Sequence, residues 1–344
     1  MYSSFRIRRF RPFLDFRIEG LQRVNLITGQ NNVGKTALLE ALFIHCGGAS
    51  INLPFAVENF RGVSQFESPM DRAVAGLFHD FDPAAAIELA ALDKLEIQRT
   101  STLRLVEAAT TIPQPGADEL PVVAGKALEL TWHDPTQPGP VTRRAAFAKD
   151  GIRADPQFPF SEAVFVHTSA RDHKTDALRF STLSKTVGED RFVEALAVIE
   201  PAIKQIRLLH HAGVSMIHVD LGLQRFLPLA YAGEGMVRLA SLLVSIGVSK
   251  NGVVLIDEFE NGLHHTVLAK VWEAVRAFSD RFNVQVFATT HSEECVRAAH
   301  SVFALHDYAF RLFRLSRLSD GTIGAMAFER DALDAALRAN LDPR

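Results

Sequence analysis

The spacing of apolar and polar residues along the chain predicts an alternation of strands and helices. Residues 5–8 alternate between apolar side chains and arginine, and residues 24–27, which are apolar except for Asn25, lead into a glycine-rich turn, so each predicts a strand. Residues 36–46 predict a helix, because leucines and a phenylalanine recur along one face. Strand, glycine-rich turn and helix in this order are typical of the first unit of an α/β domain.

The segment between residues 50 and 150 has a different pattern. A helix is predicted over 73–81, and extended apolar patterns predict strands over 92–106, 122–132 and 141–148. Proline- and glycine-rich breaks separate these strands. We therefore expect an antiparallel β subdomain here, followed by a buried strand over Ala163–Val166.

Helical spacing returns in the next stretch. Phe192, Leu196, Ile199, Ile203 and Ile206 recur at steps of four and three, which predicts a helical region that Pro201 kinks or divides. A second helix is predicted over about 236–246, and its nearly continuous apolar character indicates burial.

The last third of the chain again has α/β order. Residues 253–256 form the continuous apolar run expected of a parallel strand covered on both faces. A helix with an apolar face over 267–278 and a strand over 284–288 follow. We therefore predict one α/β domain with a mixed or parallel sheet core, in which residues 1–175 and 250–344 form the core with its β subdomain and residues 176–249 form a helical lobe.

Composition adds only broad limits. The chain has 344 residues, of which 47% are hydrophobic and 22% charged, enough apolar material for a sizeable core. A net charge of −3 implies no general attraction to DNA, and the arginines near the N-terminus are interpreted as a solvated face of a short edge strand. Two cysteines make no disulfide framework, and the sequence shows neither a signal peptide nor a run of 18 apolar residues. A cytoplasmic protein without a membrane span is the simplest expectation.

The glycine-rich turn fits the Walker A pattern of P-loop proteins. Its glycines would let backbone N–H groups surround phosphate oxygens at the positive end of the helix that follows. Lys35 would reach the β- and γ-phosphates, and the Thr36 hydroxyl would be a ligand of Mg²⁺. The predicted nucleotide-binding residues of the loop are Gly29, Asn31, Asn32, Val33, Gly34, Lys35, Thr36 and Ala37.

Polar residues at the ends of two later strands suggest the rest of a hydrolytic site. Asp257 ends the apolar strand 253–256 and is predicted to be a Walker B ligand of Mg²⁺. Glu258 follows it and could orient or deprotonate the attacking water. His291 follows the strand 284–288 and could hydrogen-bond a γ-phosphate. Both Glu258 and His291 are therefore predicted to be catalytic.

The remaining candidates give weaker signals. Gly233 and Gly235 precede a predicted helix, where glycines can form an anion site, but taken alone this pattern is better explained by a simple turn. His291 and Cys295 lie four residues apart but lack two further ligands, so we expect no metal other than Mg²⁺.

The order of these motifs resembles that of ABC and SMC-like ATPases. The segments "LITGQNNVGKTALLEALF", "LIDEFENGLHH" and "ATTHSEEC" are similar to those of the smaller AAA-family ATPases related to overcoming-lysogenisation-defect (OLD) proteins. The ending "LDPR" also resembles the ends of those proteins, so the chain is expected to be complete. The resemblance implies a P-loop NTPase fold of the ABC ATPase type, with ATP and Mg²⁺ as its ligands.

The resemblance also implies how nucleotide sites would be shared. Gly233, Glu234 and Gly235 would act as the signature motif of residues 176–249 and contact ATP held by another subunit, although Ala232 stands where the usual signature has serine. Arg11 loosely matches a nucleotide-side arginine of the family. The expected assembly is a homodimer, or a higher even oligomer, with shared ATP sites.

Several functional classes remain open. No long coiled-coil arm separates the motifs, and the segment after His291 is too short for an added nuclease domain. One hypothesis is an ATPase that controls a separate effector, a nuclease or toxin, in defence against phage or foreign DNA. The alternatives are a DNA-repair or recombination ATPase that binds nucleic acid directly, and a nucleotide switch that does not hydrolyse ATP.

Overall fold

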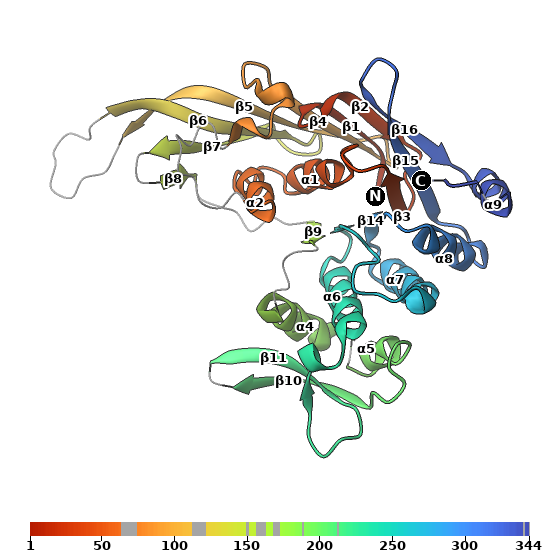
Figure 1. Ribbon diagram of the computed structural model, residues 1–344. Coiled ribbons are helices and arrows are strands. Elements are labelled where there is room, and N and C mark those ends of the chain that lie inside the picture. The colour runs from red at the N-terminus through yellow and green to blue at the C-terminus, as the bar shows by residue number, and fades with distance from the viewer. Residues whose placement is uncertain are drawn as a thin grey trace.

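Two β-sheets enclose one helix at the centre of the molecule (Figure 1). The computed structural model describes residues 1–62, 74–111, 122–148, 151–155, 163–167, 173–187, 189–211, 213–339 and 341–343. Helix α1 (Lys35–Cys46) packs against strands of both sheets and is buried around most of its circumference, as expected of a helix with apolar residues on all sides. The predicted helix over 36–46 is confirmed, and the Walker A loop lies where it begins.

The central six-stranded sheet has the order β16-β15-β3-β14-β13-β9, and it is parallel except for β16. Its strands are β3 (Val24–Gly29), β9 (Ala163–Val166), β13 (Val253–Ile256), β14 (Gln285–Thr289), β15 (Phe310–Arg317) and β16 (Ile323–Phe328). The strands predicted from continuous apolar runs are confirmed. Because the strands are parallel, the residues that follow β3, β13 and β14 meet at one edge of the sheet.

The second sheet is antiparallel and has the order β2-β1-β4-β5-β6-β7-β8. Its strands are β1 (Tyr2–Phe10), β2 (Phe13–Glu19), β4 (Ile87–Asp93), β5 (Gln98–Thr111), β6 (Val122–His133), β7 (Val141–Ala148) and β8 (Gly151–Ala154). The antiparallel β subdomain is confirmed, and β2 was missed. The single strand predicted over 92–106 is wrong, since a turn between β4 and β5 divides it. Strand β1 is not an edge strand, because it lies between β2 and β4.

Residues 173–248 combine helices with a small sheet rather than helices alone. Helices α4 (His173–Val187), α5 (Glu189–Leu196) and α6 (Glu234–Val248) accompany β10 (Gln205–His211), β11 (Val214–Asp220) and β12 (Leu227–Pro228). The helical spacing through Ile206 was misleading: α5 ends at Leu196, and Ile206 lies in β10. The sheet allows Ile206 and Ile217 to reach the same core as α6. The boundaries of the lobe stay a prediction.

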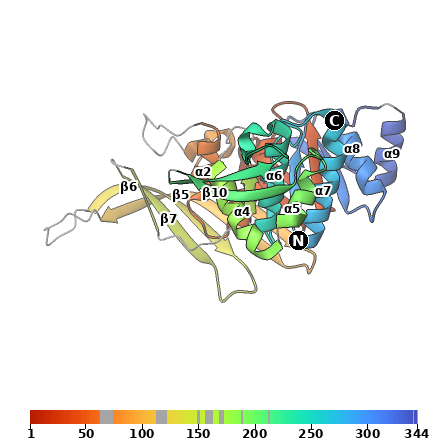
Figure 2. The same ribbon diagram turned by 90° about the horizontal axis from the view of Figure 1, so that it is seen from below.

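The helices on the other side of the central sheet complete its cover. Helix α8 (Glu293–Ala304) packs between α7 (Leu268–Phe282) and α9 (Arg330–Arg338). Figure 2 shows α4, α5, α6 and α7 side by side. Val254 and Ile256 of β13 face this helical core, while Val253 and Leu255 face the core around α1. This alternation explains why the strand is apolar throughout.

Three shorter segments complete the described chain. Of the helix predicted over 73–81, residue 73 lies outside the described residues, residues 74–75 are helical, and residues 79–81 form a 3₁₀ turn instead. The segments are α2 (Leu53–Phe60) and the 3₁₀ turns η1 (His79–Phe81), η2 (Leu229–Tyr231) and η3 (His265–Val267). Among the described residues, no helix has the length and apolarity needed to cross a membrane.

Candidate functional site

The turn between β3 and α1 has the backbone that a phosphate-binding loop requires. Gly29 has a φ of 141°, and a Cβ there would collide with the carbonyl oxygen of Leu315 on the neighbouring strand. Gly34 has a φ of 88°, and a Cβ there would lie 2.7 Å from Cζ of Phe13. Both positions therefore need glycine, for conformation and for space. The free N–H groups at the start of α1 favour an anion at this point.

Lys35 is held inside this loop. Its Nζ donates hydrogen bonds of 2.8 Å to the carbonyl oxygens of Gly29 and Gln30. Burial lowers the pKa of Lys35, and the nearby carboxylates of Asp257 and Glu258 partly oppose this shift. The ammonium group is thus placed between the loop and the acidic end of β13, where it could contact phosphate oxygens.

Thr36 and Asp257 come together from opposite ends of the sequence. The Thr36 Oγ1 lies 3.2 Å from each carboxylate oxygen of Asp257. A hydroxyl and a carboxylate are oxygen donors of the kind that Mg²⁺ uses with phosphates and water. Among the described residues no group of three or more histidine, cysteine or acidic side chains could hold a metal ion, but a magnesium site of this kind does not need one.

A threonine on the neighbouring strand fixes both acidic residues. The Thr289 Oγ1 donates a 2.6 Å hydrogen bond to Oδ1 of Asp257 and accepts a 2.8 Å hydrogen bond from the backbone N–H of Glu258. The parallel pairing of β13 with β14 brings these residues together. Sequence analysis did not select Thr289, although a polar residue at the end of the apolar strand that precedes His291 was a usable signal.

An arginine of α6 holds the backbone of the same turn. The Arg238 Nη2 donates hydrogen bonds of 2.9 and 3.0 Å to the carbonyl oxygens of Asp257 and Glu258. Glu258 has a φ of 46°, a left-handed conformation that costs free energy for a residue with a Cβ. Arg238 and Thr289 thus hold the turn in a strained shape that aims Glu258. No sequence pattern indicated Arg238.

A cavity of about 870 Å³ opens in front of the Walker A loop. Its walls include residues 31–32 and 34–37, together with His291 and Arg61. His291 is exposed, and its backbone N–H donates a 2.8 Å hydrogen bond to Oε1 of Glu260. Arg61, which sequence analysis missed, bonds Glu40 through Nε at 2.8 Å. The cavity therefore brings most of the predicted loop residues, though not Gly29 or Val33, together with His291 and an additional cation.

Arg11 borders this cavity but belongs to a buried ion-pair cluster. Its Nε lies 2.9 Å from Glu40 and its Nη2 lies 3.0 Å from Glu58, and its side chain is only 8% exposed. Burial lowers the pKa of Arg11, while Glu40 and Glu58 oppose that shift. These contacts give Arg11 a structural role in joining β1 to α1 and α2, and its predicted contact with nucleotide stays a prediction.

The glycines at 233–235 lie apart from the Walker A cavity. Gly233 caps α6 with a φ of 98° and has open space where a Cβ would lie, and Gly235 approaches the carbonyl oxygen of Gly262. No residue of 233–235 is among the described residues that line the Walker A cavity. Within one chain, these glycines and the Walker A loop therefore do not form a common site.

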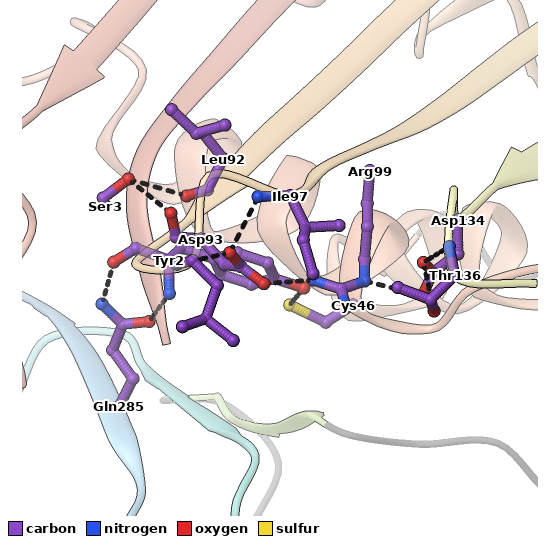
Figure 3. A network of polar contacts seen from close by, with 11 residues as sticks. Tyr2, Ser3, Cys46, Leu92, Asp93, Ile97, Arg99, Asp134, Thr136 and Gln285 are labelled. Atoms are coloured by element: carbon purple, nitrogen blue, oxygen red, sulfur yellow. Dashed lines mark hydrogen bonds and ion pairs between the residues drawn. The ribbon is translucent and has the colours of Figure 1, made fainter.

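A polar network fastens the opposite end of β14 to the antiparallel sheet (Figure 3). Gln285 exchanges hydrogen bonds of 2.8 and 2.9 Å with the backbone of Tyr2. Nearby, Arg99 links Asp93 and Asp134 at 2.9 and 2.7 Å. Burial raises the pKa of both carboxyls, but hydrogen bonds outweigh this effect and lower both pKa values, from the Ile97 N–H and Arg99 at Asp93 and from Arg99 at Asp134. Strand β14 is thus anchored at Gln285 and carries Thr289 at its other end.

Comparisons with known proteins match AAA domains and one curated relative. The family described as "AAA domain, putative AbiEii toxin, Type IV TA system" matches residues 128–297, and a family described as "AAA domain" matches residues 4–71. A protein of Helicobacter pylori named "ATP/GTP phosphatase" is 23% identical over 338 residues, with 90% of each chain covered.

Solved structures with a similar fold are heads of SMC proteins. An SMC head bound to the C-terminal winged-helix domain of ScpA has a TM-score of 0.55 and 13% identity, and covers 98% of this chain and 99% of its own. The SMC head of Thermotoga maritima has a TM-score of 0.50 and 16% identity, with coverages of 95% and 99%. The chain is thus similar to AAA domains over residues 4–71 and 128–297, and it has the P-loop NTPase fold seen in SMC heads.

Proposed function

We propose that this chain binds ATP with Mg²⁺ in the cavity at the Walker A loop and hydrolyses it with Glu258 as the general base. The observation that carries the proposal is the convergence of Thr36 with Asp257 at 3.2 Å, directly beside Glu258. These residues come from α1 and the end of β13, and the name of the Helicobacter relative is consistent with nucleotide hydrolysis.

The donor set fits a magnesium ion. The Thr36 hydroxyl and the Asp257 carboxylate would hold the ion, and water and phosphate oxygens would complete its shell. When bound, Mg²⁺ would neutralise charge on the β- and γ-phosphates. Lys35 would add a second positive charge on the same oxygens, and the N–H groups at the start of α1 would orient the phosphate chain.

In the proposed reaction, Glu258 accepts a proton from the attacking water. The oxygen of that water bonds to the γ-phosphorus as the bond from the γ-phosphorus to the bridging oxygen breaks, releasing ADP and phosphate. Thr289 and Arg238 do not touch the reacting atoms but fix the turn that directs the Glu258 carboxylate. His291 and Arg61 line the cavity and would hydrogen-bond the γ-phosphate and stabilise its developing charge.

Replacing Glu258 tests this mechanism directly. Glu258→Gln keeps the side-chain shape and removes the base, so the variant should bind ATP and lose most of its steady-state turnover. Glu273→Gln changes an equivalent group on α7, outside the Walker A cavity, and should hydrolyse ATP at the wild-type rate. If Glu258→Gln turned over ATP like the wild type, another group would be the general base.

We further propose that two copies of the chain close around two nucleotides. Gly233, Glu234 and Gly235 lie outside the cavity of their own chain, so the ATP that they contact would belong to a partner. In a two-fold dimer, one self-complementary interface places the 233–235 segment of each chain against the nucleotide of the other. Sedimentation of Glu258→Gln should show a dimer in saturating ATP and a monomer without it, and a species that stays monomeric in ATP would exclude this arrangement.

The biological role proposed is control of a separate effector in defence, as in ATPases related to OLD proteins. Two matches support it: the matched AAA family is described with a toxin of a toxin–antitoxin system, and one solved SMC head is bound to a domain of another protein. Affinity purification of Glu258→Gln from the native host should recover a nuclease or toxin. Purification without such a protein, together with ATPase activity stimulated by DNA ends, would instead support the repair function.

A further inference from the structure

The Walker A cavity extends beyond the phosphate-binding loop to a turn that no motif accounts for. Besides the loop, its walls include residues 78–81 and the β15–β16 turn at residues 320–322. A volume of about 870 Å³ is within the range typical of sites for small molecules and cofactors. If the phosphates lie at the loop, the sugar and base of the nucleotide need the remaining part of this cavity.

Phe81 is the exposed aromatic side chain at that part of the cavity. It is 73% exposed, whereas Phe78 of the same wall is 2% exposed and belongs to the core. Leu14 is the other exposed large apolar side chain among the described residues that line the cavity. A flat ring with a free face is suited to stack on a nucleobase, which presents a π-face of similar size.

The backbone at this turn carries a bulky residue where a reverse turn with two left-handed central residues usually has glycine, asparagine or aspartate. Asp80 and Phe81 have φ values of 52° and 58°, so two successive residues with side chains are left-handed. This conformation costs free energy and is least tolerated by bulky residues such as phenylalanine. Glycine or asparagine would form the turn at lower cost, so the presence of phenylalanine indicates a use for its ring.

Hydrogen bonds keep the turn beside the Walker A loop. The His79 Nδ1 lies 2.8 Å from the carbonyl oxygen of Arg11, and the Arg11 N–H donates a 2.9 Å hydrogen bond to the carbonyl oxygen of Leu77. Arg11 precedes Pro12 and Phe13, which contact the loop at Gly34. The position of Phe81 is therefore fixed relative to Lys35 and Thr36 through the β1–β2 turn.

From this cavity, exposure and strain together, we propose that Phe81 is the stacking surface for the base of the bound nucleotide. The proposal rests on the function proposed above, since it assumes that the phosphates bind at the Walker A loop. It adds a contact that depends on the base and not on the phosphates. Ligands with a triphosphate but no base should therefore not detect Phe81.

Calorimetry with two probes tests this proposal. Phe81→Ala should weaken binding of the non-hydrolysable analogue AMP-PNP about tenfold, the loss expected for one base-stacking ring, and should leave inorganic tripolyphosphate binding unchanged. Phe81→Trp should keep the affinity for AMP-PNP, because it retains a ring. Leu95→Ala, a matched control that truncates another turn residue of 79% exposure, should bind both probes like the wild type.

The outcomes separate the two proposals. If Phe81→Ala bound AMP-PNP with wild-type affinity, the stacking role would be overturned. An equal loss of affinity for tripolyphosphate would also overturn it, because the turn would then only support the loop. Lys35→Ala should weaken both probes. A wild-type protein that binds neither probe would overturn the nucleotide site itself. Thermal unfolding of Phe81→Ala at the wild-type temperature would show that any loss of binding is not a loss of fold.

Discussion

Mild acid should destabilise this protein through His45 on α1. The ring of His45 is fully buried, with centroids 5.8 Å from Tyr2 and 5.0 Å from Trp132, and its Nδ1 lies 3.0 Å from Oγ of Ser101. Burial, with a smaller contribution from the positive charge of Arg99, lowers the pKa of His45 from 6.5 to about 3. The folded protein therefore keeps this ring neutral at a pH where an unfolded chain would protonate it.

The size and sign of the effect follow from the two pKa values. Above pH 6.5 the ring is neutral in both states and contributes nothing to the pH dependence. Below pH 6.5 the unfolded state binds a proton that the folded state excludes, so the free energy of unfolding falls by about 1.4 kcal/mol per pH unit until the folded pKa is reached. At pH 5 the loss assigned to His45 is thus about 2 kcal/mol.

Urea unfolding at pH 8 and pH 5 measures this loss. His45→Gln removes the titrating group and keeps a polar atom near Ser101, so its stability should fall between these pH values by about 2 kcal/mol less than that of the wild type. His265→Gln replaces an exposed histidine and should lose as much stability as the wild type. If His45→Gln and the wild type lost the same free energy on acidification, burial of His45 would not be the cause.

The remaining predictions concern the nucleotide site. Lys35→Ala removes a charge-assisted contact and should weaken ATP binding about tenfold or more in calorimetry while the protein stays folded; unchanged affinity would contradict the loop assignment. Thr289→Val keeps the side-chain shape but breaks the hydrogen bonds to Asp257 and Glu258, and steady-state assays should show turnover reduced roughly ten- to hundredfold. His291→Ala should also slow turnover in that assay, and full activity would leave His291 a structural role. Lys35→Ala and Gly235→Asp damage different parts of a shared site, so a mixed dimer keeps one intact site. If the two sites act independently, an equal mixture should recover about a quarter of wild-type turnover, because about half of the dimers are mixed and each has one intact site of two. If turnover does not recover and the protein also sediments as a monomer in ATP, shared sites are excluded.

Local sequence predicted the elements whose pattern depends on near neighbours. The Walker A turn was predictable because its glycines, lysine and threonine are consecutive and each has a conformational or chemical reason to be there. Strands β3, β9, β13 and β14 were predictable because a strand covered on both faces is apolar at most positions. The acidic residues after β13 were found for the same reason, since polar residues at the end of such a strand stand out.

Other predictions were wrong where the same spacing of apolar residues fits more than one kind of secondary structure. The steps of four and three through Ile203 and Ile206 fit a helix, but the same residues reach the core from a turn and from β10. Residues 92–106 read as one strand because the turn between β4 and β5 lacks glycine and proline; its Asp93 side chain instead accepts hydrogen bonds from the N–H groups of Leu95 and Ile97. Only the paired strands show that the chain reverses there.

Tertiary structure alone decided which residues surround the site and which do not. Arg238, Arg61 and Phe81 stand in no motif, and the role of Thr289 within "ATTHSEEC" was not evident from that motif. The fold brings each of these residues to the Walker A cavity or to the Asp257–Glu258 turn from a different element. Arg11 borders the Walker A cavity, and the fold pairs its guanidinium with the buried carboxylates of Glu40 and Glu58, which no local pattern indicated. The sequence by itself determined the phosphate-binding loop and the apolar strands, because the backbone conformation of the loop and the burial of the strands each restrict which residue types can occupy consecutive positions. The partners of those residues depend on which distant segments pack together, and that is set by the register of the sheets and the placement of the helices.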